Sequence, residues 1–159
     1  PLPDMATMAR GLAAALQAAQ DYEDALNATR IWAQELRFRI GVHLLRGICS
    51  AAQSAKAYSD LAETCLAQLF PIVCKHLAER HGFAPGKGAA VIAMGKLGSR
   101  EMTVTSDLDL IVIYDGSEQG ESDGKRPLRG NQRRAALRGR FAAAPLGAQG
   151  AGCRGAKRI

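Results

Sequence analysis

The segment from Val91 to Asp115, VIAMGKLGSREMTVTSDLDLIVIYD, is the part of the chain that decides the fold. It contains two apolar runs, Val91–Met94 and Leu108–Tyr114, and each is short and rich in β-branched residues, which is typical of buried strands. Side chains alternate between the two faces of a strand, so Asp107 and Asp109 are predicted to share a face. Their Cα atoms would lie about 7 Å apart, because a strand rises about 3.3 Å per residue.

Two carboxylates at this spacing predict a metal site. They repel each other and are costly to desolvate, so a fold accepts them most readily where a cation neutralises them. Magnesium prefers oxygen ligands and usually leaves positions open for phosphates. Just upstream, Gly95, Gly98 and Ser99 form a turn in which backbone N–H groups and a hydroxyl can approach phosphate oxygens. The segment therefore indicates metal-dependent phosphoryl or nucleotidyl transfer, with Asp107 and Asp109 as catalytic residues and metal ligands.

Other nucleotide-binding and metal-binding motifs do not fit this segment. A Walker A loop requires glycine six residues before its lysine and Ser or Thr after it, but Ala90 and Leu97 stand at these positions around Lys96. An EF-hand loop beginning at Asp107 would place apolar residues at a ligand position and at the glycine position. The remaining alternative is a surface hairpin with two solvated aspartates, which leaves the glycines and the apolar runs unexplained.

The region before this segment is predicted to be helical. Residues 1–20 are alanine-rich and favour a first helix, and a second helix is expected from Asp21 to about Arg46, ended by Gly47. A buried stripe with a four-residue period runs along the second helix, formed by Trp32, Leu36, Ile40 and Leu44. The arginines off this stripe are predicted to form a solvated face; they include Arg30, Arg37 and Arg39.

A third helix is expected to begin at a capping box formed by Ser50 and Gln53 and to end at Gly82. Pro71 lies inside its pattern and has no backbone N–H, so the helix is predicted to be kinked or divided there.

The net charge of +6 belongs to the end of the chain. Residues 1–124 carry a charge of −4, whereas residues 125–159 carry +10 and no acidic residue. From 129 to 159, 21 of 31 residues are Ala, Gly or Arg, so this tail buries little and is expected to be disordered in isolation. A basic arm can bind nucleic acid through phosphate charge, but Phe141 is the tail's one aromatic residue for stacking, and nucleic acid is not the favoured partner.

The central segment resembles a known family. Gly95–Glu101 followed by Ser106–Leu110 is similar to the glutamine synthetase adenylyltransferases, also called glutamate-ammonia-ligase adenylyltransferases, which belong to the nucleotidyltransferase superfamily that includes DNA polymerase beta. The superfamily pattern is an apolar residue, Gly, then Gly or Ser, a short spacer and Asp-x-Asp on a strand. It falls on Leu97–Ser99 and Asp107–Asp109. The resemblance covers about residues 4–127.

The resemblance implies an α+β fold. Antiparallel N-terminal helices (residues 1–84) would precede the first strands of a polymerase-beta-like mixed sheet, which forms a partial, truncated nucleotidyltransferase domain (residues 85–128). Residues 129–159 do not resemble the family, and we hypothesise that they are read in a shifted frame from a GC-rich gene. The chain is therefore expected to be a fragment with an aberrant C-terminus.

The resemblance also implies the reaction, which is transfer of AMP from ATP to a tyrosine of glutamine synthetase in the control of nitrogen assimilation. Asp107 and Asp109 would bind Mg²⁺, and Gly98 and Ser99 would hold the β- and γ-phosphates. Lys96 would reach a phosphate or cap a strand end. A third carboxylate is expected on a later strand, beyond these residues, so this chain is expected to have little or no activity as it stands.

Further expectations concern partners and location. The family implies a PII-type regulatory protein as a partner, and the string Gly98–Thr103 resembles the adenylylating half of these bifunctional enzymes more than the adenylyl-removing half. No apolar run is long enough to span a bilayer, so a cytoplasmic protein is expected. The alternative function is a non-catalytic helical interaction module with a basic, nucleic-acid-binding tail.

Overall fold

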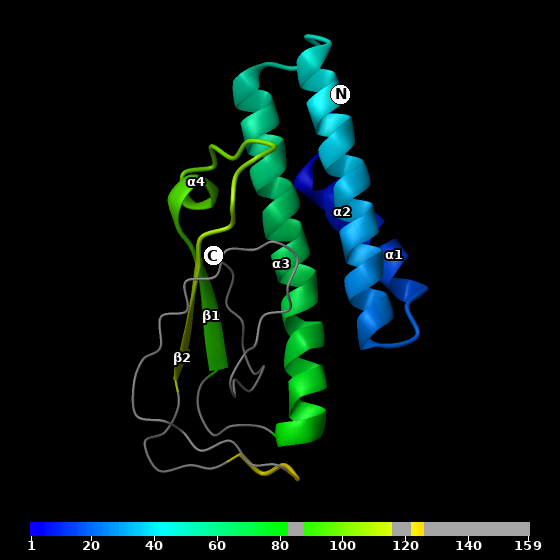
Figure 1. Cartoon of the computed structure of the whole chain (residues 1–159), viewed down its shortest axis with the longest axis vertical. Helices are drawn as coiled ribbons and strands as arrows, with labels where there is room; N and C mark the ends of the chain where they lie inside the picture. The colour runs from blue at the N-terminus through cyan, green and yellow to red at the C-terminus, as the bar shows by residue number, and fades with distance from the viewer. Residues whose placement is uncertain (83–87, 116–121, 126–159) are drawn as a thin grey trace. The chain divides into compact units, whose positions relative to one another are not determined.

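The computed structural model describes residues 1–82, 88–115 and 122–125 (Figure 1). In chain order the elements are α1 (Met5–Gln17), α2 (Tyr22–Leu45), α3 (Ala51–His81), β1 (Gly88–Ala93), α4 (Gly95–Gly98) and β2 (Leu110–Asp115). The predicted α+β class is confirmed. The basic tail of residues 129–159 lies outside the described residues.

The chain divides into two compact units. The first comprises residues 1–70 and 94–108, and the second comprises residues 71–93 and the described residues from 109 onward. The segment between the two strands therefore belongs with the N-terminal helices.

Local capping determines where α2 and α3 begin. The carboxylate of Asp21 accepts a hydrogen bond from the Asp24 N–H at 2.8 Å, and Gly47, with φ of 66°, follows the last turn of α2. Before α3, the Ser50 N–H donates to Gln53 Oε1 at 2.8 Å, and the Gln53 N–H donates to Ser50 Oγ at 3.2 Å. These predicted boundaries are confirmed.

Pro71 does not divide α3, which continues as one helix of 31 residues from Ala51 to His81. The predicted division of the helix is therefore wrong, and the alternative, a kink at Pro71, stays a prediction. A proline lacks only one helical hydrogen bond, and the long helix on both sides compensates for its loss. Pro71 is exposed, where its ring does not interrupt the packed face.

The core of the first unit lies between its three long helices. Its most completely buried apolar side chains are Met8 and Leu12 of α1 and Ile40 of α2, each at most 1% exposed. Hydrogen bonds also join α3 to its neighbours, from Gln68 Nε2 to the Ala9 carbonyl at 2.7 Å and from the Tyr58 hydroxyl to a carbonyl of α2 at 3.3 Å. The three helices thus pack around one hydrophobic core.

The predicted stripe of α2 is correct in its middle and wrong at its end. Leu36 and Ile40 are 8% and 0% exposed, and Trp32 is half-buried against Gly11 of α1. Leu44 is 38% exposed, because it lies in the last turn of α2, beside the connection to α3.

In the second unit, β1 and β2 pair antiparallel, with Val91 opposite Val112 and Ala93 opposite Leu110. Leu110 and Val112 are 2% and 7% exposed, whereas Ile113 is 48% exposed. This alternation matches the expected two-residue period.

Both strands have different bounds from those predicted. β1 begins at Gly88 and ends at Ala93, and β2 begins at Leu110, after the two aspartates. The prediction that Asp107 and Asp109 lie on the strand is therefore wrong. The reason is that Ala93 and Leu110 form the last pair of the two strands, because the chain turns into α4 soon after Ala93.

Candidate active site

The predicted glycine turn is a single turn of helix, α4, which Met94 precedes as N-cap. Gly95 has φ of 53°, in the left-handed region that favours glycine. Two buried side chains, Leu97 and Met102, each 6% exposed, anchor the segment on both sides of Ser99. The turn is thus fixed by packing, and its polar side chains remain on the surface.

Two backbone amides of the predicted phosphate cradle, those of Gly98 and Ser99, are already bonded. The Gly98 N–H donates to the Met94 carbonyl at 3.1 Å, and the Ser99 N–H donates to the Gly95 carbonyl at 3.0 Å. Both bonds are intrahelical, so neither N–H is directed toward a ligand. The sequence did not reveal this, because a Gly-x-x-Gly-Ser string fits an open loop and a helical turn equally.

The polar side chains of the turn are more accessible than its amides. Lys96 is exposed and forms no ion pair within the described residues. The Ser99 hydroxyl donates to Glu101 Oε2 at 3.0 Å. A phosphate would have to displace that carboxylate to receive the hydroxyl proton, since a hydroxyl has one proton to donate.

Asp107 and Asp109 are both exposed. Asp107 is part of the first unit, and Asp109 is part of the second unit, directly before β2. Over the described ranges, neither carboxylate has a hydrogen-bond or ion-pair partner. Exposed carboxylates without partners suit a hard cation that takes oxygen ligands, and they also suit a solvated surface hairpin.

The described residues contain no group of three or more His, Cys, Asp and Glu side chains that could hold a metal ion. Between α4 and β2, Asp107 and Asp109 are the acidic side chains without a hydrogen-bond or ion-pair partner among the described residues, since Glu101 accepts the Ser99 hydroxyl. The third carboxylate, which the resemblance places on a later strand, stays a prediction.

A hydroxyl-lined turn precedes Asp107. The Thr103 N–H donates to Ser106 Oγ at 2.9 Å, and the Ser106 N–H donates to the Thr103 carbonyl at 3.1 Å. The Thr103 and Ser106 hydroxyls lie 2.9 Å apart as a further hydrogen-bonded pair. These reciprocal bonds fix the backbone that leads into Asp107.

Two arginines hold the segment on the helices, and sequence reasoning missed the role of both. Arg37 of α2 is exposed, as predicted for a solvated face, and it also donates from Nη2 to the Val104 carbonyl at 2.7 Å. Arg100 forms ion pairs with Asp60 at 2.6 Å and Glu63 at 2.5 Å, both on α3. The contacts join residues far apart in sequence, which periodicity does not detect.

No helix within the described ranges combines the length and the apolar character that a transmembrane span requires.

Comparison with known proteins gives one family. The family model described as glutamate-ammonia ligase adenylyltransferase matches residues 1–147. The match continues past residue 127, so the limit expected from the sequence was placed too early.

Three curated relatives carry the name bifunctional glutamine synthetase adenylyltransferase/adenylyl-removing enzyme. The protein of Bradyrhizobium sp. (strain ORS 278) is 44% identical over 130 residues, which cover 81% of this chain and 13% of the relative. Those of Rhodopseudomonas palustris (strain TIE-1) and Brucella suis biovar 1 (strain 1330) are each 43% identical over 132 residues, which cover 82% of this chain and 13% of the relative. The chain thus spans about an eighth of the length of these relatives.

Proposed function

The chain belongs to the glutamate-ammonia ligase adenylyltransferase family, and from this premise we propose that it carries part of a nucleotidyltransferase site. The proposed reaction is transfer of AMP from ATP to a tyrosine of glutamine synthetase. The observation that carries the proposal is the pair Asp107 and Asp109, which are exposed and without partners in the described part of the chain. They follow a turn that presents Lys96 and Ser99.

Asp107 and Asp109 are the proposed ligands of Mg²⁺. Their carboxylate oxygens are the donors that magnesium prefers, and one intervening residue keeps their Cα atoms within about 7 Å in an extended chain. Bound magnesium would supply charge neutralisation at the transferred phosphate and acidify the attacking hydroxyl. The turn from Thr103 to Ser106 would orient Asp107 by fixing the backbone before it.

Lys96 and Ser99 are the proposed phosphate-binding side chains. The Lys96 ammonium would neutralise phosphate charge, and the Ser99 hydroxyl would exchange Glu101 for a phosphate oxygen. Gly98 would let a phosphate approach the backbone closely, because it has no side chain. Its contribution would not be a hydrogen bond, since its N–H already donates to the Met94 carbonyl.

We further propose that this chain transfers AMP slowly or not at all by itself, since its described residues contain no group of three or more His, Cys, Asp and Glu side chains that could hold a metal ion. Assignment to the adenylylating half and a PII-type regulatory partner remain predictions from the family resemblance, and a cytoplasmic location remains a prediction from the sequence. The shifted reading frame and the disorder of residues 129–159 remain hypotheses.

A non-catalytic helical interaction module is the second candidate. One observation favours it: α2 exposes three apolar side chains at seven-residue spacing, Ile31, Phe38 and Leu45, which are 51%, 74% and 88% exposed. Magnesium-dependent ATP binding separates the two candidates, because an interaction module does not require it.

The test measures binding of a fluorescent ATP analogue to the chain, with and without Mg²⁺. We expect Asp107→Asn and Asp109→Asn each to weaken binding by at least about tenfold, since each removes an anionic ligand. Glu35→Gln is the matched control, because it removes one exposed negative charge from α2 and should leave binding unchanged. Absence of magnesium-dependent binding in the unmodified chain, or equal binding by all three variants, would refute the proposal.

Catalysis is tested separately. Incorporation of labelled AMP into glutamine synthetase is measured with this chain and with a full-length relative as positive control. Transfer by this chain at the rate of the full-length relative would show that two acids suffice and would overturn the proposed low activity.

A further inference from the structure

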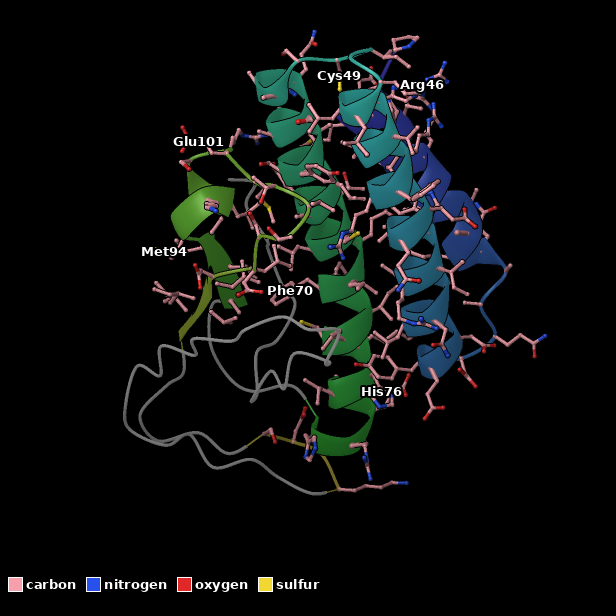
Figure 2. All side chains as sticks on the ribbon, turned by 45° about the horizontal axis from the view of Figure 1, so that its top comes forward. Arg46, Cys49, Phe70, His76, Met94 and Glu101 are labelled. Carbon is pink, nitrogen blue, oxygen red and sulfur yellow. The ribbon has the colours of Figure 1, made fainter. Side chains whose placement is uncertain are left out.

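An ionic cluster lies on α3, apart from the proposed ligands. The Asp60 side chain is 4% exposed, and its two oxygens pair with different cations, Oδ1 with Arg100 Nη1 at 2.6 Å and Oδ2 with Lys56 Nζ at 2.5 Å. The second guanidinium nitrogen of Arg100 pairs with Glu63 Oε2 at 2.5 Å. The α4 segment, which ends near the labelled Glu101, lies along the N-terminal half of α3 (Figure 2).

The two cations of Asp60 have different consequences. Lys56 is one turn before Asp60 on the same helix, so their pair does not connect α3 to any other element. Arg100 comes from the segment between the strands, 40 residues away, so its pairs join that segment to α3. Loss of Arg100 would leave the buried Asp60 carboxylate with one cation, Lys56, and with an unpaired Oδ1, so the contact to Arg100 is favoured.

The backbone of Arg100 indicates that this contact constrains the turn. Its φ is 59°, a left-handed conformation that is unfavourable for a residue with a Cβ atom and persists where the surroundings hold it. The backbone hydrogen bonds that end α4, from Arg100 to Leu97 and from Glu101 to Lys96, favour this conformation, and the guanidinium, held by two carboxylates of α3, adds a second constraint.

Arg100 is also directly connected to the proposed phosphate-binding side chains. It follows Ser99 in sequence, and its own N–H donates to the Leu97 carbonyl at 3.2 Å. The next residue, Glu101, donates from its N–H to the Lys96 carbonyl at 2.8 Å and accepts the Ser99 hydroxyl. The conformation of Arg100 therefore sets how Lys96 and Ser99 are presented.

We propose that Asp60 is a positioning residue of the nucleotide site, which acts through Arg100 to hold the turn Lys96–Glu101 on α3. Glu63 assists by accepting the second guanidinium nitrogen. The proposal rests on the proposed function for its effect on ATP, whereas the holding of the turn can be measured without any nucleotide.

The first measurement is hydrogen exchange of backbone amides in the whole chain. Asp60→Asn is expected to speed exchange at residues 94–108 by about tenfold or more, because opening of the turn becomes easier, while α1 keeps its protection. Lys56→Met is the matched control: it removes a cation from the same carboxylate but leaves the connection to Arg100, so exchange in the segment should not change. Unchanged exchange in Asp60→Asn would overturn the proposal.

The second measurement is binding of the fluorescent ATP analogue with Mg²⁺. Asp60→Asn and Glu63→Gln should both weaken it, with about a tenfold effect for Asp60→Asn, and Lys56→Met should not. Arg100→Lys keeps the charge but reaches one carboxylate at a time, so it should bind better than Arg100→Gln and less well than the unmodified chain. If Arg100 instead contacts the nucleotide itself, Arg100→Gln weakens binding while Asp60→Asn and Glu63→Gln do not, and the positioning role is refuted.

The two proposals fail in different ways. If the unmodified chain does not bind the ATP analogue, the proposed function fails, and the exchange data still decide whether Asp60 holds the turn. If Asp60→Asn does not fold, Arg100→Gln and Glu63→Gln test the same contact from side chains that are 48% and 39% exposed. Exchange at residues 94–108 that both variants leave unchanged would refute the contact's role.

Discussion

Replacement of Ile40 by alanine tests whether α2 buries this side chain in the core of the first unit. Ile40 is 0% exposed on α2, and the change removes three carbon atoms from the core. At about 0.8 kcal/mol for each buried carbon, the transfer contribution is about 2.4 kcal/mol. The remaining cavity adds to this, so the free energy of unfolding should fall by about 3 kcal/mol, within the range of 2–5 measured for such changes.

Ile31→Ala is the matched control, since it is the same substitution on the same helix at a side chain that is 51% exposed. About half of the transfer contribution applies, and the better helix propensity of alanine offsets part of that, so a loss below about 1 kcal/mol is expected. Urea unfolding is followed through Trp32, the sole tryptophan in the sequence, which belongs to the first unit. Equal losses at the two positions would contradict the burial of α2 described above.

Three further predictions concern local features. Pro71→Ala should raise the melting temperature, because alanine supplies the missing helical N–H in a continuous α3 and favours the helix by about 3 kcal/mol relative to proline. A lower melting temperature in thermal unfolding would show that the proline is needed there. Burial raises the pKa of the Cys65 thiol to about 12, so little thiolate exists below that pH. At pH 8, iodoacetamide should therefore modify Cys65 at least about 100-fold more slowly than Cys49. Similar rates for the two cysteines, measured by peptide mass spectrometry, would disprove this. Asp21→Ala should cost about 1 kcal/mol of unfolding free energy by loss of the α2 cap, whereas Asp21→Asn should retain most of it; equal effects in urea unfolding would argue against the cap.

The helices of this chain were predictable because their determinants are local. Asp21 caps α2 three residues away, and Ser50 and Gln53 cap α3 across the same distance. Gly47 adopts the left-handed conformation that ends a helix, and few other residues adopt it at low cost. Such signals lie within one turn of the residue that they affect, so a single sequence contains them in full.

The site was predictable in its residue types and not in its geometry. The bounds of β2 depend on the register with β1, which sequence alone does not give, so the aspartates were placed on the strand. The ion pairs of Arg100 with α3 and the contact from Arg37 to Val104 join residues far apart in sequence. No local pattern indicated that Asp60 pairs with Arg100, because the two residues are 40 positions apart in the sequence.

The contact between Arg37 and the Val104 carbonyl has a consequence for how this protein can be dissected. A piece excised at residue 85, where the sequence suggests that the nucleotidyltransferase part begins, would lose Arg37 together with Asp60 and Glu63. The stretch from 94 to 108 would then keep its own residues but none of these three helical tethers. The helices α2 and α3 are therefore needed to hold this stretch, and an excised piece that keeps all three contacts should begin before α2.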